Sequence, residues 1–98
     1  MKLTVTEAAA TWYKDEMMLE GNETIRFFVR YGGCSNVQKG FSLGVNTDSP
    51  KNVGVETKVD GLTFFVEDED LWYFDGHDLT VNYNEETREP DFHYEAQE

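Results

Sequence analysis

The single cysteine of the chain, Cys34, is the residue best suited to chemistry. It follows Gly32 and Gly33, and glycine permits the turn that points backbone N–H groups at a sulfur atom. The segment from Thr24 to Thr47 contains no acid, and it holds three cations: Arg26, Arg30 and Lys39. These charges favour a thiolate, the form that binds soft metals and iron–sulfur clusters. The alternatives are that Cys34 is a small buried hydrophobic residue and that the missing acids reflect chance and burial.

His77 and His93 are further candidate ligands for a soft metal. Both lie in acidic surroundings that are typical of turns or strand ends, and each could equally be a solvated surface histidine. The sequence has no Cys-x₂-Cys, His-x₃-His or His-Glu-x-x-His spacing. The four acids Glu67–Asp70 could hold a hard cation, but no EF-hand spacing follows them. A solvated start of a helix is the favoured interpretation of this run.

Several function classes are disfavoured. Gly32 and Gly33 join two predicted strands, which is the wrong context for a dinucleotide-binding loop. No arrangement of Ser, His and Asp indicates a hydrolase. The net charge is −12: residues 1–55 hold six acids and six bases, whereas residues 56–98 hold 14 acids and two bases. We therefore expect no binding to nucleic acid or to an anionic membrane.

Length and composition favour one domain over residues 1–98. A lone cysteine fits a reducing compartment, since it offers no disulfide within the chain. The first residues lack the apolar run of a signal peptide, and no segment has the roughly 20 apolar residues of a membrane span. The expected location is the cytoplasm.

The elements that must position these residues are mostly strands. Residues 2–5 form a short strand, and Thr6 then caps a helix that runs to Leu19 or Glu20, with Gly21 in a left-handed conformation. Alternating apolar residues predict strands over 24–31, 37–45, 53–59, 62–66, 79–83 and 91–95. Residues 32–36 are expected to be a tight loop, and residues 46–52 a longer one.

Shorter signals connect these strands. Asp60-Gly61 predicts a two-residue hairpin turn. Asp68 is the predicted cap of a short helical turn that Asp75-Gly76 closes. Gly40 and Gly44 share one face of their strand, which indicates close packing or a bend. The predicted fold class is mostly β (α+β): a compact sandwich or partly open barrel of short strands with one N-terminal helix.

The segment VRYGGCS, residues 29–35, resembles the glycine-rich segment around the first cysteine of HesB-like, A-type iron–sulfur cluster carriers. The order of features agrees. Thr6–Ala9 opens the early helix, Phe74–Gly76 is placed like the family's Leu-Asp-Gly, and Phe92–Tyr94 is placed like its final Gly-Phe-x-Phe strand. The resemblance spans roughly residues 2–95. It implies a HesB-like fold, a role in iron–sulfur cluster assembly, and donor or acceptor proteins as partners.

The sequence departs from this family in its ligands. The closing Cys-Gly-Cys segment of the carriers has no counterpart, and Asn36 replaces a common glycine, so the chain resembles the short, single-cysteine YneR-like branch. A [2Fe–2S] cluster needs four ligands, so a homodimer would have to bring two copies of Cys34 together. The resemblance implies a non-enzymatic protein that binds iron or a [2Fe–2S] cluster through Cys34, with His77 or His93 as auxiliary ligands.

The alternative is a cluster-free protein-interaction or regulatory module on the same fold, in which Cys34 serves packing. A thiol enzyme or redox sensor is a third hypothesis. It is disfavoured because no general base lies at a telling distance from Cys34 in the sequence.

Overall fold

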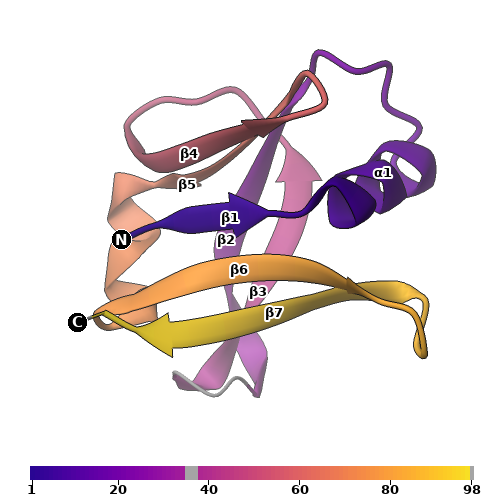
Figure 1. Cartoon of the computed structure of the whole chain (residues 1–98). Helices are drawn as coiled ribbons and strands as arrows, with labels where there is room; N and C mark the ends of the chain where they lie inside the picture. Colours follow the sequence, from indigo (N-terminus) through magenta and orange to yellow (C-terminus); the bar gives the residue numbers. More distant parts are fainter. Residues whose placement is uncertain (35–37, 98) are drawn as a thin grey trace.

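The computed structural model describes residues 1–34 and 38–97, and Figure 1 shows their arrangement. The elements in chain order are β1 (Leu3–Val5), α1 (Glu7–Glu16), β2 (Thr24–Cys34), β3 (Lys39–Thr47), β4 (Val53–Val59), β5 (Leu62–Glu67), the 3₁₀ helix η1 (Asp68–Phe74), β6 (His77–Asn84) and β7 (Glu89–Ala96). Neither of the helices in these ranges is long and apolar enough to cross a membrane.

The strands in the described part of the chain form two sheets. One has the order β3-β2-β5-β4 and the other the order β1-β6-β7. The pairs β2–β3, β4–β5 and β6–β7, whose strands follow each other in the chain, are antiparallel. The pairs β1–β6 and β2–β5 are parallel. In Figure 1 the strands β6 and β7 cross in front of β2 and β3. The predicted β-rich fold with one N-terminal helix is confirmed, and these sheets do not close into a barrel.

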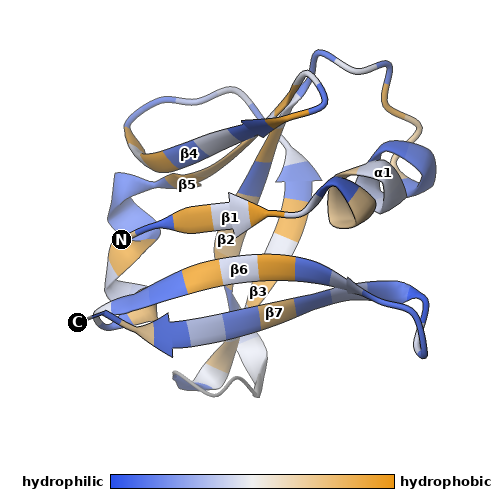
Figure 2. Ribbon diagram, viewed as in Figure 1, coloured by the Kyte–Doolittle hydropathy of each residue, from blue (hydrophilic) through white to orange (hydrophobic). Residues whose placement is uncertain are grey.

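The core lies between the sheets and is rich in aromatic rings. Phe27 of β2 stacks on Phe64 of β5 with ring centroids 5.8 Å apart, and Phe92 of β7 meets Phe27 edge-on at the same distance. Tyr13 of α1 packs against both Phe27 and Phe64. Figure 2 shows apolar residues alternating with polar ones along β1 and β6, the pattern of strands with one buried face. Burying each large apolar side chain contributes about 1.5–3 kcal/mol.

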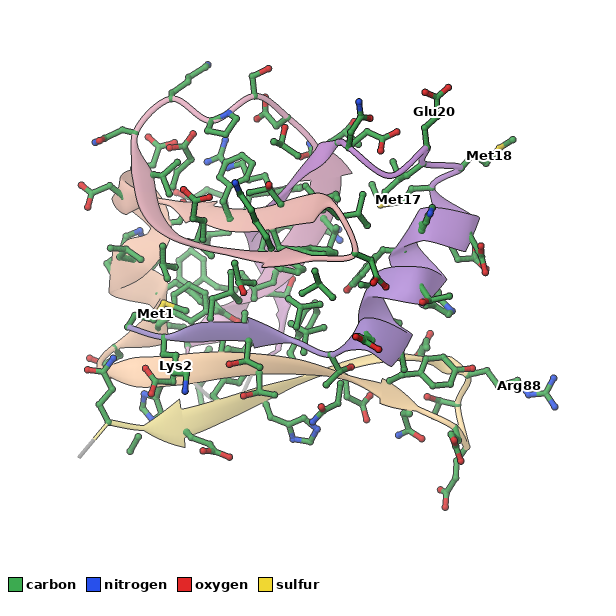
Figure 3. The ribbon with its side chains drawn as sticks, turned by 45° about the horizontal axis from the view of Figure 1, so that its top comes forward. Met1, Lys2, Met17, Met18, Glu20 and Arg88 are labelled. Atoms are coloured by element: carbon green, nitrogen blue, oxygen red, sulfur yellow. The ribbon has the colours of Figure 1, made fainter. Side chains whose placement is uncertain are left out.

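The helix α1 begins as predicted, because the Thr6 hydroxyl accepts a hydrogen bond from the Ala9 N–H at 3.2 Å. Its predicted end at residues 19–20 was wrong, since α1 stops at Glu16. Gly21 has the predicted positive φ, at 122°, but Met18, at φ 54°, is the residue that ends the helix in the left-handed region. Figure 3 shows Met18 pointing away from the end of α1.

Two backbone bonds explain the early end of α1. The Leu19 N–H donates to the Lys14 carbonyl at 2.8 Å, and the Met18 N–H donates to the Asp15 carbonyl at 3.3 Å. These bonds satisfy carbonyls that the helix leaves without a partner. Glu23 then organises the following turn, since its carboxylate accepts the N–H groups of residues 20–22. These bonds lower the pKa of Glu23 to about 2.

The strand predictions hold with shifted boundaries, although Val37, the predicted start of the strand over 37–45, lies outside the described residues. The hairpin at Asp60-Gly61 is confirmed by φ values of 51° and 82°. Of the two explanations for the glycines of β3, close packing applies to Gly44 and a bend of the strand applies to Gly40. A Cβ at Gly44 would lie 2.4 Å from the Phe28 ring, and Gly40 has φ 81°. The alternation over 53–59 predicts that Val53 faces inward, but Val53 is 37% exposed at the point where the register of β4 is irregular.

Candidate functional site

The residues before Cys34 extend β2 instead of forming the predicted loop. Tyr31 pairs with Phe41, the register then shifts, and Cys34 pairs with Lys39. Gly32 and Gly33 absorb the shift at φ 96° and 76°, which side chains other than glycine rarely adopt. The predicted loop was therefore wrong for residues 32–34, while Ser35 and Asn36 lie outside the described residues.

The backbone of Cys34 has one of the three predicted cations as a direct cross-strand neighbour. Lys39 pairs with it, at a Cα separation of about 5 Å for antiparallel partners. Arg26 lies eight residues back along β2, roughly 25 Å away at about 3.3 Å per residue, well beyond the screening length of about 8 Å. Arg30 is about 13 Å away by the same count. Of the three predicted cations, Lys39 is thus the one that lies directly across the strand pair from this position.

The two histidines lie on opposite faces of the sheet that contains β6 and β7. His77 alternates in phase with the buried Leu79, and its Nδ1 lies 2.8 Å from the Phe74 carbonyl oxygen and 3.0 Å from the Asp75 carbonyl oxygen. Because carbonyls only accept, Nδ1 carries a proton, and in the neutral ring Nε2 is the nitrogen with a lone pair. His93 pairs with Thr80 and points outward, between inward-facing neighbours.

No set of three or more His, Cys, Asp or Glu side chains comes together as a metal site in residues 1–34 and 38–97. One chain has one thiolate to offer, whereas a [2Fe–2S] cluster needs four ligands. Among the described residues, the donors of a single copy therefore do not form a complete cluster site.

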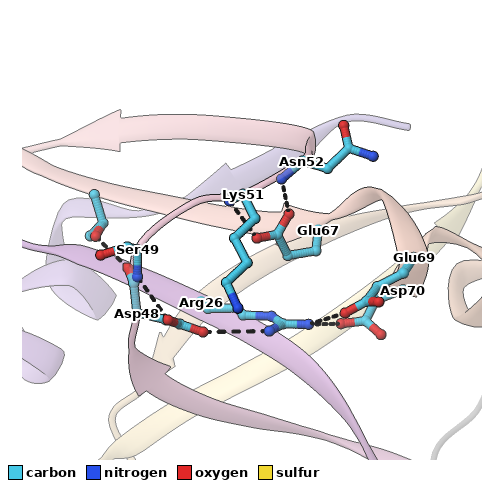
Figure 4. A network of polar contacts seen from close by, with 9 residues as sticks. Arg26, Asp48, Ser49, Lys51, Asn52, Glu67, Glu69 and Asp70 are labelled. Atoms are coloured by element: carbon cyan, nitrogen blue, oxygen red, sulfur yellow. Dashed lines mark hydrogen bonds and ion pairs between the residues drawn. The ribbon is translucent and has the colours of Figure 1, made fainter.

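A charged cluster that the sequence did not predict surrounds Arg26 (Figure 4). Its guanidinium lies 3.4 Å from Asp48, 3.1 Å from Glu69 and 3.0 Å from Asp70, measured to a carboxylate oxygen. Partial burial lowers the pKa of Arg26, but the hydrogen bonds and negative charge of these carboxylates outweigh it and raise the pKa. The cluster joins β2 to the loop after β3 and to η1.

Glu67 is buried beside this cluster, with 4% of its surface exposed. Its carboxylate accepts the N–H of Lys51 at 2.8 Å and the N–H of Asn52 at 2.7 Å, as Figure 4 shows. The helix start predicted for Glu67–Asp70 is confirmed, since η1 begins at Asp68 and its first-turn acids Asp68 and Glu69 are exposed. The prediction was wrong for Glu67, which is buried, and for Asp70, which is partly buried against Arg26. Asp68 is not the cap either, since η1 starts after Glu67 and has no side-chain cap.

Three aromatic side chains form an exposed group, which we name the aromatic patch: Tyr31 of β2, Phe41 of β3 and Trp72 of η1. The ring centroids of Tyr31 and Phe41 are 5.3 Å apart, and those of Phe41 and Trp72 are 5.2 Å apart. Tyr31 is 90% exposed and Trp72 is 51% exposed. The patch lines an open hollow of about 220 Å³, shared with Val29, Glu69 and Asp70.

A second, larger hollow of about 570 Å³ opens between α1, β3 and β7. Its apolar lining includes Trp12, Met17, Leu43 and Phe92, with Arg30 and two acids at its polar positions. Sequence reasoning missed both hollows, because their walls come from elements far apart in the chain.

Comparison with known proteins gives a consistent family. Residues 1–97 match the family described as iron-sulphur cluster biosynthesis. The chain is 59% identical to the pyruvate dehydrogenase inhibitor of Bacillus subtilis, over 97% of this chain and 100% of that protein. It is 40% identical to an uncharacterized protein of Staphylococcus aureus, over 84% of this chain and 87% of that protein.

The fold also has a solved counterpart. The crystal structure of Escherichia coli SufA, a protein involved in biosynthesis of iron-sulfur clusters, matches 96% of this chain and 86% of that one, with a TM-score of 0.61 at 20% identity. The resemblance seen in the sequence is therefore confirmed. The chain belongs to the iron-sulphur cluster biosynthesis (HesB-like) family, with relatives in its YneR-like branch.

Proposed function

We propose that this protein is a non-enzymatic regulator that binds and inhibits the pyruvate dehydrogenase complex. The observation that carries the proposal is the 59% identity to the pyruvate dehydrogenase inhibitor of Bacillus subtilis along the whole of that protein. A fold alone does not define a function, so this relative weighs more than the distant structural match. The proposal takes up the regulatory alternative derived from the sequence.

Features of the structure support a role in protein binding. The aromatic patch exposes Tyr31 and Trp72, residue types that are enriched in protein interfaces. One copy carries a single cysteine, so cluster transfer by the monomer lacks ligands, whereas inhibition by binding needs none. The net charge of −12 favours a basic partner surface. The site of action would be the cytoplasm.

The test is a titration of the purified chain into the pyruvate dehydrogenase complex of Bacillus subtilis, followed by NADH formation from pyruvate. We expect the rate to fall with added chain and the end point to scale with enzyme concentration, as for a stoichiometric inhibitor. A different 2-oxoacid dehydrogenase complex serves as control for selectivity. An unchanged rate at a large molar excess of the chain would refute the proposal.

A second function is favoured by the match of residues 1–97 to the iron-sulphur cluster biosynthesis family. In it, Cys34 binds iron or a [2Fe–2S] cluster that passes between donor and acceptor proteins. Two copies of Cys34 would come together in a homodimer, with Nε2 of His77 or the ring of His93 completing the ligands.

Anaerobic reconstitution with iron and sulfide tests this second function. Wild type should take up iron and show cluster absorption, and Cys34→Ser should not. Equal, negligible uptake by both proteins would eliminate it and leave the inhibitor as the function.

A further inference from the structure

The aromatic patch exposes large apolar side chains to water, which is unfavourable for an isolated protein. Tyr31 is 90% exposed although its neighbours on the same side of β2, Ile25 and Phe27, are completely buried. The row of apolar side chains on this side of β2 therefore continues past the core and ends with an exposed ring at Tyr31. Contiguous exposed apolar groups usually mark sites of protein contact, and Trp and Tyr are the residue types that most often dominate binding energy there.

The patch is also held in place before any partner arrives. Trp72 is directly followed by Tyr73 and Phe74, which are 0% and 1% exposed and anchor η1 in the core. Leu71 packs onto the backbone of β4, where a Cβ at Gly54 would lie 2.8 Å from it. Asp70 ties the same segment to β2 through Arg26. Binding to fixed side chains costs less conformational entropy than ordering mobile ones.

The charge around the hollow specifies the occupant. Glu69 and Asp70 line it together with the patch, and both contact the same guanidinium nitrogen of Arg26. One cation faces three carboxylates in this cluster, so its net charge is 1 − 3 = −2. Glu69 is 76% exposed and open to an incoming cation. Aromatic faces attract cations as well.

The hollow measures about 220 Å³, which is below the roughly 300–1,000 Å³ of sites for small-molecule ligands. It suits a single inserted side chain. A second copy of this chain would bring another net charge of −12 to the surface, and the repulsion disfavours it as the occupant.

From these features we infer that the aromatic patch and Glu69 form the docking surface for the pyruvate dehydrogenase complex. The partner surface presents a lysine or arginine side chain to the hollow, next to an apolar side chain that covers Trp72. This inference rests on the proposed function and names the part of the molecule through which it acts.

The experiment compares inhibition constants for the Bacillus subtilis pyruvate dehydrogenase complex. Tyr31→Ala and Trp72→Ala should each raise the constant about tenfold or more, the usual effect of losing an interface anchor. Met18→Ala is the matched control, since Met18 is 88% exposed just after the end of α1, and it should leave the constant unchanged. Because the Tyr31 side chain is almost fully exposed, its removal leaves the fold intact, and thermal unfolding of each variant verifies this.

A second pair of variants tests the charge. Glu69→Gln should weaken inhibition and reduce its sensitivity to salt, while Glu20→Gln, an exposed acid beyond α1, should change neither. If the patch variants inhibit the complex as strongly as the wild-type chain does, the assignment of the docking surface is wrong and the proposed function still holds. A shift in the oligomeric state of free Tyr31→Ala would overturn the docking surface too, because the patch would then join two copies. An inactive wild type would overturn both proposals.

Discussion

Glu67→Gln should destabilise the protein strongly, although the two side chains have nearly the same shape. Each oxygen of Glu67 accepts one backbone N–H, from Lys51 at 2.8 Å and from Asn52 at 2.7 Å. The amide of glutamine keeps one oxygen and turns an NH₂ group toward the other N–H donor. The position is 4% exposed, so water cannot replace the lost acceptor.

The magnitude follows from hydrogen bonds to a charged acceptor. Losing one such bond costs about 1.5–3 kcal/mol, and the remaining bond weakens because its acceptor is now neutral. We expect the free energy of unfolding to fall by about 2–3 kcal/mol, out of a total of about 5–15 kcal/mol for a domain. At about 4–8 °C per kcal/mol for a chain of this size, Tm should fall by about 10–20 °C.

Urea unfolding at neutral pH, followed by far-UV circular dichroism, measures the change. Glu20→Gln is the control, because that side chain is exposed at the turn after α1. An effect of Glu67→Gln below about 0.5 kcal/mol, equal to that of a surface substitution, would refute the reasoning. It would mean that the turn before β4 does not depend on this buried carboxylate.

Three further predictions concern other parts of the fold. In urea titrations, Gly61→Ala should lower the free energy of unfolding by clearly more than Gly40→Ala. The two glycines have nearly the same φ, 82° at Gly61 and 81° at Gly40, so the backbone strain is similar. Only at Gly61 would the new Cβ clash, because it would lie 2.3 Å from the Gly21 carbonyl oxygen. The pKa of Glu23 is lowered to about 2 in the folded protein, compared with about 4.3 in the unfolded chain. The ionised carboxylate therefore stabilises the fold at a pH above about 5, and this stabilisation is lost as the pH falls toward 2. Glu23→Gln should flatten that part of a Tm-against-pH curve, and an unchanged slope would contradict the assignment. Phe27→Ala, which removes a completely buried ring, should cost about 3–5 kcal/mol in the same urea assay, and a loss under about 1 kcal/mol would show that the site repacks.

Local patterns in the sequence carried much of the fold. The alternation over 24–31 predicted a strand, and the fixed side-chain period of two places Ile25 and Phe27 on the same side, which is the buried one. Asp60-Gly61 and the Thr6 cap were also predictable, since each depends on a few neighbouring residues. The end of α1 was not, because Met18 takes a left-handed conformation that its residue type disfavours.

The features that the sequence did not predict depend on long-range pairing. Arg26 meets carboxylates 22, 43 and 44 residues further along the chain, and no local spacing indicates such contacts. The parallel pairing of β2 with β5 brings η1 alongside and assembles both the cluster and the aromatic patch. At Gly32 and Gly33 the residue types indicated a break, but a glycine pair serves a bulge as well as a loop. The roles of Cys34, His77 and His93 as ligands stay predictions.

The short helix η1 contributes both to the exposed aromatic patch and to the buried core, and its sequence cannot change for one role without affecting the other. Trp72 faces the solvent while the next two residues, Tyr73 and Phe74, plug the interior. A mutation that rotates this segment by one residue would exchange a buried ring for an exposed one and damage folding and surface together. Adaptation to a new partner should therefore proceed through the neighbouring strand positions, such as Tyr31, which can vary without disturbing the packed interior.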